Sequence, residues 1–97
     1  MARVVYSAGA LRDLERIVEL LLEASPESAG QAVSQIADAV DVLAGHPRIG
    51  RRVQGPLREL VISHGASGYL ALYRFDRPQG VIRILHVRHQ REAGYQD

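Results

Sequence analysis

The stretch from Ser25 to Pro47, SPESAGQAVSQIADAVDVLAGHP, decides the fold of this chain. Apolar residues recur in it at spacings of four, three, four and three: Ala29, Val33, Ile36, Val40 and Leu43. This period places them on one face of a helix. Serine followed by proline is a typical helix start, because serine caps the first turn and proline suits the first helical position. Gly45 and then Pro47 end the helix.

The segment before this helix predicts a second helix and a short strand. After Ser7, which suits an N-cap, apolar residues again follow at three- and four-residue spacing: Leu11, Leu14, Val18 and Leu21. Residues 2–6 alternate in the manner of a strand. Since only the Ser-Pro break separates the two helices, we expect them to form an antiparallel hairpin.

The segment after the long helix predicts a loop and three strands. Residues 46–56 are rich in glycine, proline and arginine and are expected to form the loop. Three apolar runs follow, separated by turn-forming stretches at residues 63–68 and 76–80: residues 57–62, 69–75 and 81–88. Such short links favour antiparallel hairpins. The last run is apolar on both faces, which indicates an interior strand, and the tail from residue 89 to 97 is polar.

These elements predict one α+β domain over residues 1–97, in the order β-α-α-β-β-β. A chain of 97 residues has room for a single hydrophobic core. The natural packing for this order is a helical hairpin that covers one face of a mostly antiparallel sheet.

The formal net charge of +1 hides an asymmetry between the two halves. Residues 1–45 carry three arginines and seven acids, a balance of −4, whereas residues 46–97 carry nine arginines and four acids, a balance of +5. Such a split favours a polyanion or an acidic partner for the second half, although solvated faces on acidic helices produce the same asymmetry. All twelve basic residues are arginine, whose planar cation suits phosphates and carboxylates.

Composition also argues against several classes of function. The chain has no cysteine, which excludes disulfides, thiolate zinc sites and a cysteine nucleophile and suits the cytoplasm. Its four histidines lack ligand spacing and have no carboxylate cluster beside them, so neither a metal nor another cofactor is expected. No apolar run approaches the roughly 20 residues that cross a bilayer, and the start of the chain does not resemble a signal peptide.

Several strings resemble, in the same order along the chain, the RelE/ParE superfamily of toxins from type II toxin–antitoxin operons. They are Tyr6-Ser7-Ala8 with Leu11-Arg12-Asp13-Leu14-Glu15-Arg16-Ile17, then Leu43-Ala44-Gly45-His46-Pro47-Arg48-Ile49-Gly50-Arg51, then Leu57-Arg58-Glu59-Leu60 with Gly68-Tyr69-Leu70-Ala71-Leu72-Tyr73-Arg74, and finally residues 82–95. No single string is diagnostic, but together they cover nearly the whole chain. The resemblance implies the same α+β fold and an antitoxin partner in a heterodimer or heterotetramer.

RelE-like members of this superfamily cut messenger RNA on the ribosome without a metal, and the resemblance implies candidates for that chemistry in the tail. His89 suits a proton carrier because its ordinary pKa lies near neutrality. Arg91 or Arg88 can hold a phosphate, and Tyr95 can stack on a base or assist proton transfer. Each has a structural alternative: Tyr95 as a lid on the sheet, His89 as a polar strand end, and Arg88 as an ion-pair partner of Glu92 or Glu59.

Further arginines are expected to bind RNA: Arg51, Arg52, Arg58 and Arg74. Two departures weaken the nuclease interpretation. Strong RelE-like members have an arginine just after the Gly-Tyr pair, where this chain has Leu70, and several use lysines in the preceding loop, which are absent here. His86 shares a predicted strand face with Ile82 and Ile84, so we expect it to be a partly buried histidine with a satisfied hydrogen bond.

ParE-like members instead poison DNA gyrase by a protein–protein contact and have a long helical hairpin, as predicted here. The last strand of this chain also resembles theirs. The sequence slightly favours ribosome-dependent cleavage, with the gyrase poison as the alternative and a degenerate toxin that only binds its antitoxin as a third class. The target is accordingly either the ribosome with its message or gyrase.

Overall fold

The computed structural model describes residues 1–64 and 67–96. Its elements are β1 (Arg3–Tyr6), α1 (Ala8–Ala24), α2 (Pro26–Asp41), a short 3-10 helix (Val42–Ala44), β2 (Arg51–Gln54), β3 (Leu57–His64), β4 (Ser67–Asp76) and β5 (Val81–His89). The two helices, the first strand and the three later strands confirm the predicted order. Residues 63–64 and 67–68, which were expected to lie in a turn, belong to β3 and β4, and residues 65–66 lie outside the described part of the chain.

The strands form one sheet in the order β1-β5-β4-β3-β2. β1 runs parallel to β5, and all other neighbours are antiparallel. The prediction that the last strand is interior is confirmed, since β5 has a neighbour on each side. The fold is therefore an α+β fold with a mostly antiparallel sheet, as expected.

The prediction that residues 46–56 form only a loop is wrong, because β2 lies within them. All four residues of β2 are exposed, so its sequence carries no alternation between buried and solvated positions. The strand is fixed instead by its pairing with β3, which it reaches through a turn at Gly55 with a φ of 53°. The isolated segment gives no sign of that pairing.

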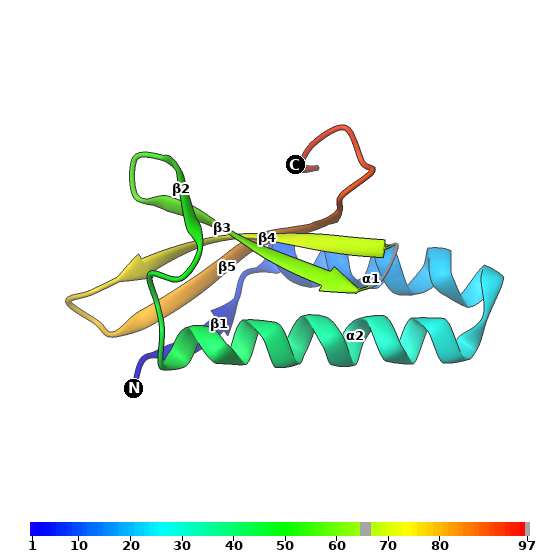
Figure 1. The fold of residues 1–97 in the computed structure, drawn as a ribbon, viewed down its shortest axis with the longest axis horizontal. Helices are drawn as coiled ribbons and strands as arrows, with labels where there is room; N and C mark the ends of the chain where they lie inside the picture. Colours follow the sequence, from blue (N-terminus) through cyan, green and yellow to red (C-terminus); the bar gives the residue numbers. More distant parts are fainter. Residues whose placement is uncertain (65–66, 97) are drawn as a thin grey trace.

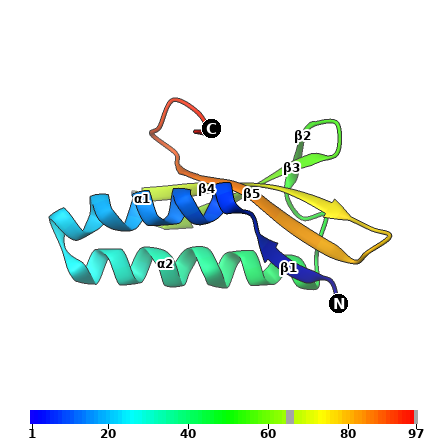
Figure 2. The same ribbon diagram turned by 180° about the vertical axis from the view of Figure 1, so that it is seen from behind.

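The helical hairpin covers one face of the sheet, and the C-terminal tail rises from the other face (Figure 1). The view from behind shows the same two layers, with β1 beside the start of α1 (Figure 2). The core lies between the helices and the sheet, and its largest fully buried side chains include Tyr73, Ile36, Leu43, Ile82 and Ile84. We call the face of the sheet turned away from the helices the open face.

Both predicted helix starts are confirmed. The Ser7 hydroxyl accepts a hydrogen bond from the Ala10 N–H at 3.1 Å, and the Ser25 hydroxyl accepts one from the Ser28 N–H at 3.4 Å. The predicted apolar faces are only partly correct. Leu11 and Val33 are exposed, although they belong to the expected stripes.

The buried row of α1 runs instead through Ala10, Asp13 and Ile17, one position away from the predicted stripe. This row packs toward β5, whereas the stripe through Leu11 and Val18 borders a shallow groove on the helix surface. In the described part of the chain, no helix has the length and apolar character needed to cross a membrane.

Candidate functional site

A bulge in β5 decides which side chains reach the open face. Tyr73 pairs with Ile84, but the preceding residue of β4, Leu72, pairs with His86, so Leu85 is an extra residue. The bulge reverses the alternation beyond it. The expectation that His86 shares a face with Ile82 and Ile84 is therefore wrong, and Val87 takes the core position instead, at 0% exposure.

His86 nevertheless has the satisfied hydrogen bond that was expected. Its Nδ1 lies 3.0 Å from Asp13 Oδ2, and the same oxygen accepts a hydrogen bond from the Val87 N–H at 2.8 Å. β1 ends at Tyr6, which pairs with Ile84, so the Asp13 carboxylate provides the acceptor that a longer neighbouring strand would have supplied. Asp13 therefore has a buried role at the edge of β5.

Glu59 is the second buried carboxylate and lies on the open face. It pairs across the sheet with Leu72 and with Arg51, and it is only 5% exposed. Arg51 donates to Glu59 Oε1 from Nε at 3.0 Å and from Nη2. Tyr95 reaches back from the tail and donates its hydroxyl to Glu59 Oε2 at 2.6 Å. We call Glu59, Arg51, Tyr95 and Arg88 the clasp.

Arg88 closes the clasp from β5. Its guanidinium carbon lies 5.1 Å from the centre of the Tyr95 ring, and Nη1 donates to the backbone carbonyl of Glu92 at 2.7 Å. The Glu59 carboxylate thus joins β2, β3 and the tail, and Arg88 links β5 to them through the Tyr95 ring. It also covers the open face there, because Leu70, an outward-facing residue of β4, is only 9% exposed.

The clasp fixes the protonation states of its two acids. Burial by itself raises the pKa of Glu59, but hydrogen bonds from Tyr95 and Arg51 and the charges of Arg51 and Arg88 outweigh it, so this pKa lies below its ordinary value. Burial and the hydrogen bond to the Glu59 carboxylate raise the pKa of Tyr95 well above its ordinary value. Near neutral pH, Glu59 is therefore ionised and Tyr95 keeps its proton.

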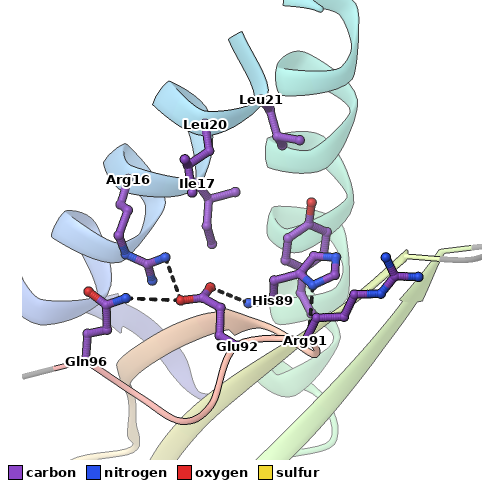
Figure 3. Close-up of a pocket in the computed structure, with 9 residues that line it drawn as sticks. Arg16, Ile17, Leu20, Leu21, His89, Arg91, Glu92 and Gln96 are labelled. Atoms are coloured by element: carbon purple, nitrogen blue, oxygen red, sulfur yellow. Dashed lines mark hydrogen bonds and ion pairs between the residues drawn. The ribbon is translucent and has the colours of Figure 1, made fainter. Parts of the chain in front are cut away.

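His89 and Arg91, the other two predicted catalytic residues, border the opposite side of the sheet. His89 pairs with Tyr69, and the two rings meet edge to face with their centres 5.3 Å apart. Both His89 and Arg91 border a pocket of about 470 Å³ whose apolar wall comes from α1 (Figure 3). The structure thus separates the predicted catalytic residues into two pairs: Arg88 with Tyr95 in the clasp, and His89 with Arg91 at this pocket.

Glu92 anchors the tail between these two regions. Its carboxylate accepts hydrogen bonds from Arg16 of α1 at 2.7 Å and from the His89 N–H at 2.9 Å, and Gln96 donates to it at 3.2 Å (Figure 3). Burial opposes ionisation, but these hydrogen bonds and the charge of Arg16 lower the pKa of Glu92 below its ordinary value. The Arg16–Glu92 ion pair joins residues 76 positions apart.

The four arginines predicted to bind RNA do not converge on one point. Arg51 belongs to the clasp, whereas Arg52 is exposed and pairs with Arg58 across β2 and β3. Arg58 donates to the backbone carbonyls of Arg48 at 3.2 Å and Gly50 at 2.8 Å, so it holds the loop before β2. Arg74 is exposed on the open face of β4, two residues after Leu72, which pairs with Glu59 of the clasp.

The loop before β2 is also held by a buried tyrosine. The Tyr73 hydroxyl donates to the Pro47 carbonyl at 2.9 Å and accepts from the Gly50 N–H at 2.9 Å. A Cβ at Gly50 would lie 2.6 Å from the Tyr73 ring, so this approach requires glycine. This arrangement fixes where β2 starts and hence where Arg51 meets Glu59.

Glu59 and Asp13 were not among the predicted site residues. An acid at an outward position of a strand, among arginines, was the available signal for Glu59. Asp13 gave no comparable signal, because its partners lie 73 and 74 residues away. Among the residues that the structure describes, no three histidine, aspartate or glutamate side chains form a group that could hold a metal ion.

Comparison with known proteins assigns this small α+β domain to the toxins of type II toxin–antitoxin systems. A family model described as the ParE toxin of the type II toxin–antitoxin system parDE matches residues 4–94. Toxin RelE3 of Caulobacter vibrioides is 37% identical over 92 residues, covering 95% of this chain and 98% of that toxin. A putative toxin of Sinorhizobium fredii, Y4kP, is 32% identical over 90 residues, covering 91% of each chain.

Solved structures agree. A chain of the chromosomal ParDE system of P. aeruginosa superposes with a TM-score of 0.73 at 25% identity, covering 90% of this chain and 94% of that one. A chain of the toxin–antitoxin complex RelBE2 of Mycobacterium tuberculosis gives 0.61 at 25% identity, covering 92% and 98%. The chain belongs to the RelE/ParE superfamily of type II toxins, as the sequence predicted.

Proposed function

We propose that this toxin acts by binding rather than by catalysis, and that it poisons DNA gyrase in the manner of ParE-like members. The observation that carries the proposal is the clasp. The clasp brings one carboxylate and one phenol together among arginines, and these two groups are hydrogen-bonded to each other at 2.6 Å. Neither is available to move a proton to or from a ribose or a phosphate.

The protonation states support this conclusion. A general base must exchange protons near the operating pH. The pKa of Glu59 is lowered and that of Tyr95 is raised, so both move away from neutrality. His89, the natural proton carrier, contacts Tyr69 on the helix side of the sheet. Leu70 stands where strong RelE-like members have an arginine, which further favours a contact surface.

Ribosome-dependent cleavage of messenger RNA is the second candidate, and one observation favours it. Three relatives between 34% and 37% identical carry the name RelE toxin. Under this alternative Arg88 would hold the phosphate and the clasp would have to open, releasing Tyr95 from Glu59. His89 would have to leave its contact with Tyr69 to serve as the proton carrier.

The partner in either case is an antitoxin encoded beside the toxin. The similar solved chains come from ParDE and RelBE2 systems, which supports such a partner. The helices expose apolar side chains that a monomer gains nothing from exposing, among them Leu11, Leu20 and Leu22. We expect an amphipathic antitoxin segment to cover part of this helix surface.

Two assays on the purified toxin test the proposal. Gyrase supercoiling should fail in its presence and broken DNA should accumulate, while a translation extract should keep its message intact. Antitoxin added in equal amount should restore supercoiling. Cleaved message with normal supercoiling would overturn the proposal and establish the second candidate.

His89→Gln sharpens the distinction between the two mechanisms. A nuclease that uses His89 as its proton carrier loses at least about 100-fold in cleavage rate, the usual contribution of a general acid or base. A binding toxin keeps its growth arrest, because the substitution leaves the open face unchanged. Growth arrest that disappears with a folded His89→Gln variant would contradict the binding mechanism.

A further inference from the structure

Three arginines gather on the open face at the end away from the tail. Arg83 of β5 lies directly opposite Arg74 of β4. Arg3 of β1 pairs with Val81, which precedes Arg83 by two residues on β5. Residues paired across a sheet point to the same face, and so do residues two apart on one strand. We call Arg3, Arg74 and Arg83 the arginine patch.

The patch lacks the compensation that the clasp has. Within residues 1–64 and 67–96, no carboxylate lies within ion-pair distance of any of its three guanidinium groups. Asp76 is the next outward residue on β4, yet it pairs with Val81 and forms no ion pair with the patch. Among the described residues, the patch side chains make one hydrogen bond, a long one from the Arg83 guanidinium to the Gln79 amide oxygen at 3.3 Å.

This arrangement of like charges lowers the stability of the folded state. Like charges directly opposite each other on a sheet are destabilising, and any oppositely charged or apolar pair would be better there. Residues that break a local rule of stability without compensation are typical of functional sites. The patch arginines therefore differ from Arg51, Arg58 and Arg88, each of which stabilises an identifiable contact.

The geometry points to a phosphate-binding site: the arginine patch takes the phosphodiester backbone of DNA when the toxin engages gyrase. Two guanidinium groups on adjacent strands lie close enough to grip one phosphate, and arginine suits phosphate through its planar fork. The inference rests on the proposed function in one respect, because it takes the DNA to be the substrate of the poisoned enzyme.

A phosphate fits the surroundings of the patch better than an acidic protein segment does. Protein hot spots combine charge with apolar anchors that bury fully on binding. The apolar neighbours of the Arg74–Arg83 pair in the register are Val5, Leu57 and Leu72, and each is already partly buried. Val61, an exposed apolar residue of this face, lies on β3 four residues beyond Leu57, with Glu59 of the clasp between them.

The first test measures binding of the toxin alone to a labelled DNA duplex by fluorescence anisotropy over a series of salt concentrations. R74Q/R83Q should bind at least about tenfold more weakly, and the salt slope should fall by about 0.9, the contribution of the one phosphate that the two arginines share. R12Q/R48Q removes the same charge from exposed positions off the patch and should leave both quantities within about twofold of the wild type.

R74K/R83K tests the geometry, since it keeps the charge and removes the fork. It should restore the salt slope but only part of the affinity. Equal weakening in R74Q/R83Q and R12Q/R48Q would overturn the inference, because net charge alone would then explain the binding. An unchanged affinity in R74Q/R83Q would overturn it as well.

The second test separates DNA from protein partners and separates this inference from the proposed function. A photo-crosslinking residue at Gln79, beside Arg83, should label DNA in a mixture of toxin, gyrase and DNA. Labelling of gyrase or of the antitoxin in place of DNA would overturn the phosphate site. Wild-type toxin that leaves supercoiling intact while R74Q/R83Q still weakens DNA binding would refute the gyrase proposal and leave the phosphate site standing.

Discussion

The two ends of the open face use arginine in opposite ways. At the tail end, Arg51 and Arg88 flank the buried Glu59 and hold the C-terminal tail against the sheet. At the other end, Arg74 and Arg83 face each other with no acid between them. Both ends use arginine, but only the tail end has a buried carboxylate, Glu59, that neutralises the charge.

That difference separates stability from binding capacity. The charge of an arginine that is paired with an internal carboxylate is already neutralised, so this arginine attracts an anionic ligand only weakly. Two arginines without an acid partner attract an anion more strongly. The clasp should therefore respond to mutation in the free energy of unfolding, and the arginine patch should respond in binding.

The largest effect is expected from Glu59→Ala. Glu59→Ala removes the acceptor of the Tyr95 hydroxyl, at a cost of about 1.5–3 kcal/mol for a hydrogen bond to a charged group. It also removes the ion pair with Arg51, which adds only about 0.2–1 kcal/mol because the Arg51 side chain is exposed. Urea unfolding should show this loss, while Glu19→Ala on the exposed side of α1 should change stability by less than about 0.5 kcal/mol. A loss below about 1 kcal/mol for Glu59→Ala would mean that the clasp does not stabilise the fold.

Tyr95→Phe should have a smaller effect of about 1.5–3 kcal/mol, the range for a hydrogen bond to a charged group. The ring and its contact with Arg88 remain, so only the hydroxyl bond to Glu59 is lost. Amide exchange should accelerate across the tail and remain unchanged in α2. A tail that stays protected in Tyr95→Phe would show that Glu92 and Arg16 hold it alone.

The pH dependence of stability gives a third test. The folded-state pKa of Glu59 is lowered, so its ionised form stabilises the fold above the ordinary value of 4.5, and this stability is lost as pH falls through the lower folded-state value. Glu59→Gln should flatten the acid limb of the stability curve by about 1.4 kcal/mol for each unit of that shift. Glu92 contributes in the same direction, so part of the slope should remain.

Most of the fold could be predicted from periodicity and turn residues. The hairpin follows from Ser25-Pro26 and the helical spacing, and β3, β4 and β5 follow from apolar runs between turns. β2 could not be predicted, because its four residues are all exposed and only β3 specifies it. β3 stabilises β2 by pairing with it, and the sequence pattern of β2 alone carries no sign of this pairing.

The candidate site was predicted less completely, because one extra residue in β5 changes the face of the sheet to which the later side chains point. A strand pattern assigns faces by counting residues, and the extra residue Leu85 reverses the count for His86 and everything after it. Tyr95 and Arg88 were expected to lie near each other, and they are in contact. Tyr95 also lies against the open face of the sheet, which was its alternative, structural interpretation. Their separation from His89 depends on where the tail folds, which local sequence does not specify.

The smallest stability effect, and the one that bears most directly on the contrast, is expected from R74Q/R83Q. Removal of two opposed like charges should leave the free energy of unfolding unchanged or raise it by about 0.2–1 kcal/mol, since the pair opposes the sheet contact that it occupies. Urea unfolding at low and high salt should show the gain shrinking as salt screens the repulsion. R12Q/R48Q should show no such salt-dependent gain. If R74Q/R83Q instead unfolds more easily by more than about 1 kcal/mol, the arginine patch stabilises the fold as the clasp does, and the case for a binding site there loses its physical basis.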